Sequence, residues 1–256
     1  KEYKPDYNIG FPAKRITTQL EWEDMVLDYQ VAAELEEINV WISSGKTVME
    51  DWGLSRILKA GYRSLFYGPP GTGKTLAATL LGKKNEMDVY RIDLSMIVSK
   101  YIGETEKNLA KVFDLAENRN WILFFDEADA LFGKRTSTNT SNDRHANQEV
   151  AYLLQRIEDF PGMVILATNL RSNIDEAFSR RFQSVVYFPM PTEEQRAELW
   201  RNMLPGKWLG KDAEELITMA AETELSGGAI TNVVRRCALR MIQSKKKLLD
   251  KVMLKE

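Results

Sequence analysis

Residues 68–75 read Gly-Pro-Pro-Gly-Thr-Gly-Lys-Thr, which matches in full the pattern of a phosphate-binding loop. Apolar residues 65–67 precede the loop and predict a short buried strand, and residues 76–81 predict a helix. Glycines let backbone N–H groups approach a phosphate closely, and a helix N-terminus adds partial positive charge. The alternative is a plain turn rich in glycine and proline. The complete match and its strand–loop–helix context favour the phosphate-binding loop.

This loop predicts binding of a nucleotide together with Mg²⁺. Lys74 would reach the β- and γ-phosphates, and Thr75 would offer its hydroxyl group to the metal ion. The nucleotide-binding residues predicted in this stretch are Pro70, Gly71, Thr72, Gly73, Lys74, Thr75 and Leu76.

Predicted strands alternate with predicted helices along the chain as far as residue 188, which indicates an α/β fold with a parallel sheet flanked by helices. After the phosphate loop, strands are predicted over 89–93, 121–125, 163–167 and 185–188, and helices over 104–118 and 144–158. Residues 133–143 are polar and predict a loop. Ligands of such sheets bind at the carboxyl ends of the strands.

Three regions are predicted. Residues 1–20 are polar, without periodicity, and indicate an N-terminal arm or linker. Residues 21–190 would form the nucleotide-binding domain, which opens with helices over 30–42 and 46–60. Residues 191–256 contain helical patterns only and predict a small all-α domain.

Polar side chains follow two of the predicted strands. Asp126 comes after a continuous apolar run, where its carboxylate would hold Mg²⁺, and Glu127 beside it would act as general base toward water. The alternative is that this acidic stretch caps the next helix. Asn169 follows another strand and could orient the attacking water, or it could simply occupy a turn.

Arg180 and Arg181 form a second candidate catalytic group. Since Lys74 already serves the phosphates of its own subunit, we predict that the arginines reach a nucleotide bound to a neighbour. In other NTPases an arginine supplied in this way raises the rate by about 10³–10⁵. The alternative is a solvated basic pair at a helix end.

Composition narrows the function classes. The chain of 256 residues has a net charge of −2, so it lacks the basic excess typical of non-specific nucleic-acid binding. Its single cysteine cannot form an internal disulfide, which suits a reducing, cytoplasmic location. No apolar run approaches the roughly 18 residues of a membrane span, and no signal peptide is visible. Because the sequence starts abruptly at Lys1, we expect it to be a fragment of a longer protein.

Taken together and in this order, the motifs resemble those of an AAA ATPase of the AAA+ superfamily over nearly the whole chain from about residue 22. In family terms, the motifs are Walker A, Walker B, sensor 1 and the arginine fingers. The resemblance implies ATP or ADP and Mg²⁺ as cofactors, an α-helical lid, and ATP sites between the subunits of a homohexameric ring. No arginine directly follows the lid turn, as in narrow-sense AAA proteins that remodel proteins.

The resemblance also assigns roles outside the core motifs. Lys100, Tyr101 and Ile102 resemble the aromatic pore loop that grips a polypeptide, although Tyr101 could instead pack on the domain. The lid turn near Gly228 and Ala229 would lie over adenine and ribose, and Val26 with Leu27 would hold the adenine edge.

The sequence leaves two functions open. The first is an ATP-driven motor that remodels, unfolds or disassembles a protein substrate through a central pore. The second is a DNA-associated AAA+ ATPase such as a loader or helicase component, which the acidic balance of the chain and Tyr101 disfavour.

Overall fold

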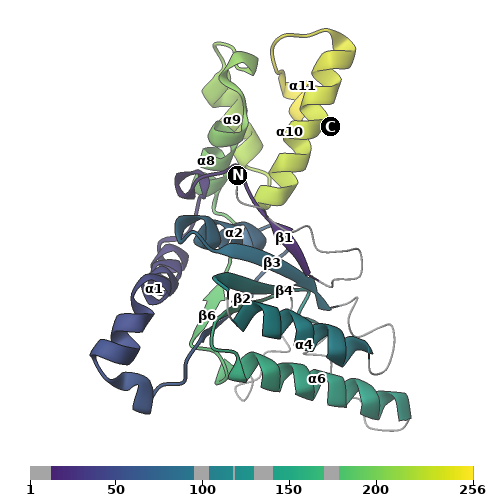
Figure 1. Cartoon of the computed structure of the whole chain (residues 1–256). Helices are drawn as coiled ribbons and strands as arrows, with labels where there is room; N and C mark the ends of the chain where they lie inside the picture. The colour runs from purple at the N-terminus through teal and green to yellow at the C-terminus, as the bar shows by residue number, and fades with distance from the viewer. Residues whose placement is uncertain (1–12, 95–103, 118, 130–140, 170–178, 256) are drawn as a thin grey trace, which may run out of the picture.

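The computed structural model describes residues 13–94, 104–117, 119–129, 141–169 and 179–255 (Figure 1). Within these ranges a six-stranded sheet has the order β1-β3-β4-β5-β2-β6, and all neighbouring strands are parallel except β1 and β3. The predicted α/β fold with a helical C-terminal region is confirmed. The strands are β1 Ala13–Ile16, β2 Tyr62–Tyr67, β3 Asp88–Asp93, β4 Trp121–Asp126, β5 Met163–Thr168 and β6 Ser184–Tyr187.

Strand β1 corrects the expectation of an arm or linker over residues 1–20. Ala13–Ile16 pair antiparallel with β3, and Arg15 forms an ion pair with Asp88 at 2.6 Å. Only Ala13 of this strand is buried, so the segment carries no apolar alternation that sequence analysis could detect. Pairing with the open edge of β3, rather than burial, makes it a strand.

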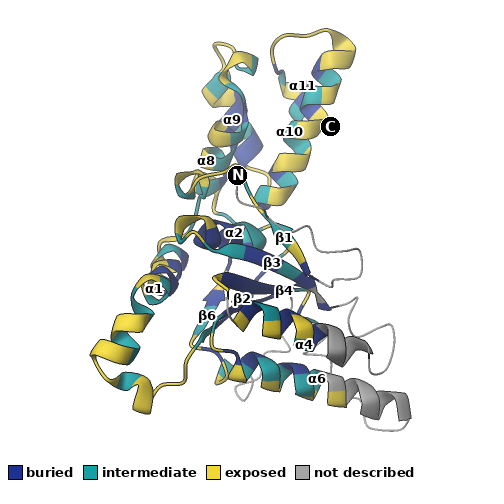
Figure 2. Cartoon of the chain, viewed as in Figure 1, coloured by how far each residue is buried: buried dark blue, intermediate teal, exposed yellow. Residues whose placement is uncertain are grey.

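Alternate side chains of the central strands enter two separate cores, one on each face of the sheet. In β4, Ile122 and Phe124 face one core, while Leu123 and Phe125 face the other. Figure 2 shows the strands as the most deeply buried layer. Helices α1 (Tyr29–Lys46) and α2 (Lys74–Lys84) cover the first face, and helices α4 (Glu104–Glu117) and α6 (Ser141–Asp159) cover the second.

Two helix boundaries differ from the prediction. No regular second helix spans 46–60, because α1 continues into a π-helical turn, η2 (Thr47–Asp51), and the chain turns at Gly53 with φ of +70° before a short 3₁₀ turn, η3 (Leu54–Arg56). Helix α6 starts at Ser141, so the end of the predicted loop is helical, and residues 130–140 lie outside the described residues. Residues Trp22–Asp24 form another 3₁₀ turn, η1.

The C-terminal helices form a lid with its own hydrophobic core, centred on Trp200, Ile230 and Cys237. Buried Arg196 donates hydrogen bonds to the carbonyl oxygens of Pro191 and Ala221, both at 2.7 Å, and so fixes the start of the lid. A separate core that begins beyond β6 supports a domain boundary near residue 190. The lid elements are α8 Glu193–Met203, η4 Gly206–Trp208, α9 Ala213–Ala221, α10 Gly227–Ser244 and α11 Lys251–Lys255.

Gly82 lets α2 approach the sheet closely, which gives a stability test. A Cβ atom there would lie 2.2 Å from a methyl group of Val89 and 2.9 Å from the carbonyl oxygen of Met87. Alanine would improve helix propensity by about 1 kcal/mol, but overpacking typically costs about 1–3 kcal/mol. Because a 2.2 Å approach is a severe clash, its cost lies in the upper part of that range, and we expect Gly82→Ala to lower the free energy of unfolding by about 1–2 kcal/mol in urea titrations.

The matched control is Gly45→Ala near the end of α1. There the nearest atoms belong to the partly exposed Trp41 side chain, at 3.2 Å, which can shift. We expect this change to raise the free energy of unfolding by up to about 1 kcal/mol, because no backbone clash offsets the gain in helix propensity. A Gly82→Ala protein more stable than the parent would show that α2 does not pack as described.

Candidate nucleotide-binding site

The phosphate loop and the predicted acidic residues meet at one edge of the sheet. Tyr67, the last residue of β2, pairs with Thr168, the last residue of β5, and β4 on the other side of β5 ends at Asp126. Because these strands are parallel, the residues that follow them lie together. The structure thus brings Lys74, Asp126, Glu127 and Asn169 into one cleft.

The phosphate loop makes direct contact with the lid. Gly71 has φ of +75°, a conformation that side chains with a Cβ rarely adopt, and a Cβ there would lie 2.5 Å from the Ser226 hydroxyl oxygen. The carbonyl oxygen of Gly71 accepts a hydrogen bond from the backbone N–H of Gly228 at 3.0 Å. The lid therefore closes over the loop through backbone contacts that only small residues permit.

Lys74 is the buried cation of the site, with 7% of its surface exposed. Its Nζ donates hydrogen bonds to the carbonyl oxygens of Gly68 and Pro69, both at 2.8 Å, and to Oδ1 of Asn169 at 2.9 Å. Burial lowers the pKa of the Lys74 ammonium to about 8, and the nearby charges of Asp126 and Asp129 oppose that shift. The ammonium can exchange these neutral oxygens for phosphate oxygens.

Asp126 is held from two sides. Its Oδ1 accepts a hydrogen bond from the backbone N–H of Glu127 at 3.0 Å, and its Oδ2 lies 2.9 Å from Nε of Arg91 in an ion pair. Arg91 lies on β3, and sequence analysis did not single it out. The available signal was a charged residue between the apolar residues Tyr90 and Ile92, but only the pairing of β3 with β4 shows which carboxylate it meets.

Glu127 is exposed at the rim of the cleft and has φ of +54°. A residue other than glycine in this region carries a strain of about 1–3 kcal/mol, which the surrounding structure must offset. The next residue provides an anchor, since the backbone N–H of Ala128 donates to the carbonyl oxygen of Ala167 at 2.9 Å. The strained turn places the Glu127 carboxylate beside the cleft instead of extending β4.

Asp129 fixes the end of β5. Its Oδ1 accepts hydrogen bonds from the Thr168 hydroxyl group and, at 3.2 Å, from the backbone N–H of Asn169. Asn169 in turn accepts from Lys74, so a chain of hydrogen bonds links the two predicted motifs. Sequence analysis considered Asp129 only as part of a helix cap. Its role in orienting Asn169 depends on a contact between residues 40 positions apart.

The cleft has a volume of about 460 Å³, within the range of small-molecule sites. Val26, Leu27 and Gly228 line the cleft, and their contact with adenine and ribose stays a prediction. Ala229 is not among the lining residues; its backbone N–H donates to the Ser226 hydroxyl oxygen at 3.3 Å. Further lining residues that sequence analysis missed include Met25, Gln195, Leu199, Met203, Gly227 and Thr231.

The remaining predicted residues lie elsewhere. Arg180 and Arg181 are exposed and are not among the residues that line the cleft. Arg181 forms an ion pair with Glu158 of α6 at 2.5 Å. Lys100, Tyr101 and Ile102 lie outside the described residues, so their role stays a prediction.

The site lacks a preformed metal cage. Within the described ranges, no group of three or more histidine, cysteine, aspartate or glutamate side chains could hold a metal ion. Mg²⁺ in nucleotide sites takes one or two protein ligands and completes its shell with phosphate oxygens and water. Thr75 and Asp126 both line the cleft, so the residues present fit that arrangement.

The fold and the cleft define the class of protein. A buried strand, a glycine-rich loop and a helix beginning at Lys74, with acidic residues at the end of a nearby parallel strand, make this a P-loop nucleoside triphosphatase fold. Comparison with known proteins gives the family. Residues 64–190 match the family described as "ATPase family associated with various cellular activities (AAA)".

Relatives agree with this match. The chain is 42% identical over 146 residues to cell division protein C of Sulfolobus acidocaldarius, across 53% of this chain and 38% of that protein. It is 31% identical over 193 residues to the proteasome-activating nucleotidase of Methanocella arvoryzae, and the match covers 73% of this chain and 46% of that protein. It is 34% identical over 188 residues to mouse vacuolar protein sorting-associated protein 4B, and the match covers 70% of this chain and 42% of that protein.

The chain therefore belongs to the AAA ATPases. Its matched part spans less than half the length of these three relatives.

Across the described ranges, no helix combines the length and apolar character that crossing a bilayer requires.

The buried lysine predicts that nucleotide affinity depends on pH. The pKa of Lys74 is about 8 without nucleotide, and a bound phosphate would raise it. The affinity should therefore be close to its maximum below about pH 7, be halved at about pH 8, and fall by up to about tenfold per pH unit above about pH 9. Calorimetric titration of ADP in two buffers of different ionisation enthalpy should show uptake of about half a proton at pH 8.

Lys84→Ala is the matched control, since it removes an exposed lysine from the other end of the same helix. That variant should keep the full proton uptake. An ADP affinity that is constant from about pH 7 to about pH 9.5 would contradict the assignment of Lys74 as the titrating phosphate ligand.

Proposed function

We propose that this chain is an ATP-hydrolysing AAA+ motor that assembles into a ring, a homohexamer, and remodels, unfolds or disassembles protein substrates in the cytoplasm. One observation carries the proposal: Lys74, Asp126, Glu127 and Asn169 share a cleft, whereas Arg180 and Arg181 stand outside it. Such a site has the groups for binding and water activation but needs a neighbour to supply its arginines.

The residues of the cleft divide the chemistry among them. Lys74 binds the β- and γ-phosphates, and residues 71–76 wrap the phosphates with backbone N–H groups. Glu127 accepts the proton of the attacking water, and Asn169, fixed by Asp129, orients that water. Thr75 and Asp126 would hold Mg²⁺, which would supply positive charge next to the phosphates.

The apolar part of the cleft suits the base of the nucleotide. Val26 and Leu27 on one side and the Gly228 turn on the other would enclose adenine and ribose. Because Gly228 also bonds to the phosphate loop, the lid would respond to what the loop binds.

A protein substrate is the favoured cargo. One relative is a nucleotidase that activates the proteasome, and another is associated with vacuolar protein sorting, both names that point to work on proteins. We propose that Lys100, Tyr101 and Ile102 grip the polypeptide in a central pore. A DNA-associated ATPase is the second candidate, which the net charge of −2 disfavours. The buried free thiol of Cys237 suits a reducing cytoplasm.

Mixing two inactive variants tests the shared site. Glu127→Gln should bind ATP without hydrolysing it. Arg180→Ala should also bind ATP and should hydrolyse it about 10³-fold more slowly than the parent. In a random equimolar ring, about one interface in four joins an intact Glu127 to a neighbour's intact Arg180. Steady-state assays of the mixture should therefore recover about a quarter of the parent ATPase activity.

Arg201→Ala is the matched control, because this exposed lid arginine pairs with Glu214 and lies away from the cleft. It should hydrolyse ATP at the parent rate. If mass spectrometry shows mixed rings that remain inactive, the arginines do not act between subunits. The same experiment with Arg181→Ala tests whether Arg181, which pairs with Glu158 of its own chain, also acts on the nucleotide of a neighbour.

Tyr101 tests the threading of a polypeptide. An aromatic face grips varied side chains through contact area, so Tyr101→Ala should abolish processing of fluorescein-labelled casein while basal ATPase activity is largely retained. Tyr101→Phe should retain most of the processing, since the ring and not the hydroxyl group makes the contact.

Thermal unfolding of the same variants separates the alternative. If Tyr101 packs on the domain instead, Tyr101→Ala will lower the melting temperature and the basal ATPase activity together. A stable Tyr101→Ala protein that processes casein at the parent rate would rule out this residue as the grip.

A further inference from the structure

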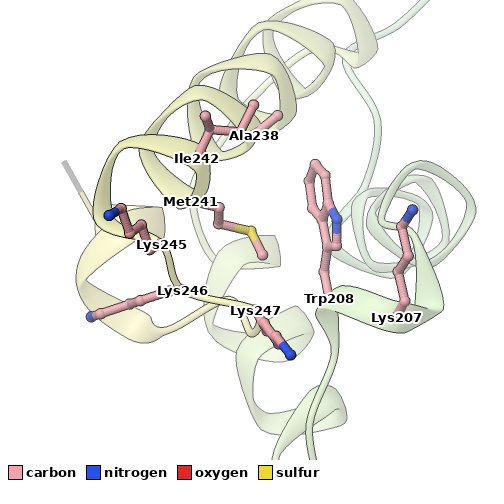
Figure 3. Close-up of a pocket in the computed structure, with 8 residues that line it drawn as sticks. All are labelled: Lys207, Trp208, Ala238, Met241, Ile242, Lys245, Lys246 and Lys247. Atoms are coloured by element: carbon pink, nitrogen blue, oxygen red, sulfur yellow. The ribbon is translucent and has the colours of Figure 1, made fainter.

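A second hollow lies at the end of the lid that is remote from the nucleotide cleft. Its volume is about 600 Å³, and it opens between η4 and the C-terminal half of α10 (Figure 3). The indole of Trp208 stands on one side, and Ala238, Met241 and Ile242 of α10 stand on the other. The cleft reaches along α10 as far as Thr231, and the hollow begins at Ala238, roughly 10 Å further along the helix. The two share no lining residue, so they are separate sites.

The walls of this hollow are apolar and in part unburied. Ile242 is 74% exposed although it is a large aliphatic residue, and Leu239 and Leu248 nearby in the sequence are 57% and 51% exposed. Met241 and Trp208 belong to the lid core or pack against it, so the apolar surface continues from the core to the outside. Removing such a surface from water by covering it with another apolar group is favourable in free energy.

The rim of the hollow is strongly basic. Of its eight described lining residues, four are lysines, Lys207, Lys245, Lys246 and Lys247, and none is acidic. Lys246 forms an ion pair with Asp250 at 2.5 Å. The sequence from 225 to 249 has no acidic residue but contains three arginines and three lysines. In a chain whose net charge is −2, this end of the lid is a local concentration of positive charge.

We propose that this hollow docks an acidic segment of a partner protein, which inserts an apolar side chain between Trp208 and Ile242 and places its carboxylates against the lysines. Apolar walls and a cationic rim are complementary to a peptide that carries both kinds of group. The aliphatic stems of the lysines extend the apolar surface while their ammonium groups face the carboxylates.

The shape of the site distinguishes this occupant from other anions. A bilayer is flat and covers protruding side chains, whereas a hollow of about 600 Å³ accepts an inserted side chain. Nucleic acid would use the lysines but would leave the aliphatic wall of α10 without an apolar partner. An acidic peptide with an apolar residue satisfies both features.

A displayed library of random 16-residue peptides, selected on the immobilised 256-residue chain, tests the proposal. The selected peptides should be rich in aspartate and glutamate and should contain leucine, phenylalanine or tryptophan. Fluorescence anisotropy of a labelled selected peptide should show binding that Ile242→Ser or Lys247→Glu weakens about tenfold or more.

The chain offers matched controls for both changes. Ile57→Ser removes an isoleucine that is 78% exposed in the other domain, and Lys111→Glu reverses an exposed lysine of α4. Neither should change peptide affinity, and circular dichroism melts should show that all four variants fold.

Three results would overturn the proposal. Selected peptides could show no excess of acidic residues, or they could bind the Ile242→Ser and Lys247→Glu variants as tightly as the parent. The third is binding to phosphatidylglycerol vesicles or to single-stranded DNA that these variants lose, without any selection of acidic peptides. That result would assign the hollow to a lipid surface or a nucleic acid.

Discussion

The burial of one ammonium group governs the architecture of the site. Lys74 lies at the start of α2 and beneath the phosphate loop, where desolvation disfavours its charge and lowers its pKa to about 8. Carbonyl oxygens of Gly68 and Pro69 and the amide oxygen of Asn169 compensate in part. These oxygens come from two different strand ends, so the cation requires β2 and β5 to be neighbours in register. A phosphate would supply the full negative charge that neutral oxygens cannot.

The lid is built onto the same loop, and this gives binding a mechanical consequence. The carbonyl oxygen of Gly71 accepts a hydrogen bond from the backbone N–H of Gly228, so a displacement of the loop would act on the start of α10. That helix runs as one element from the cleft to the lysine-rimmed hollow near Ile242. A rigid helix transmits a shift at one end to the other, which would link the nucleotide state to whatever the hollow docks.

Sequence reasoning worked where a local pattern carries the physical information. The phosphate loop, the apolar strands and the amphipathic helices were predicted. The strands could be recognised because burial on both faces requires continuous apolar runs. It failed for β1, whose pairing with β3 replaces burial, and for residues 46–60, where exposed irregular turns resemble a weak helix. Arg91 and Asp129 were missed because each acts through a partner on another strand or loop.

The sequence by itself determined the chemistry that this protein can carry, because the loop from 68 to 75 and the acidic pair at 126 and 127 are each a contiguous stretch of the chain. Tertiary structure decided which groups act together. It joined Asp129 to Asn169 and Lys74, excluded Arg180 and Arg181 from their own cleft, and gathered four lysines around an apolar hollow. These outcomes depend on strand order and helix packing, which fix distances between residues that no local pattern relates.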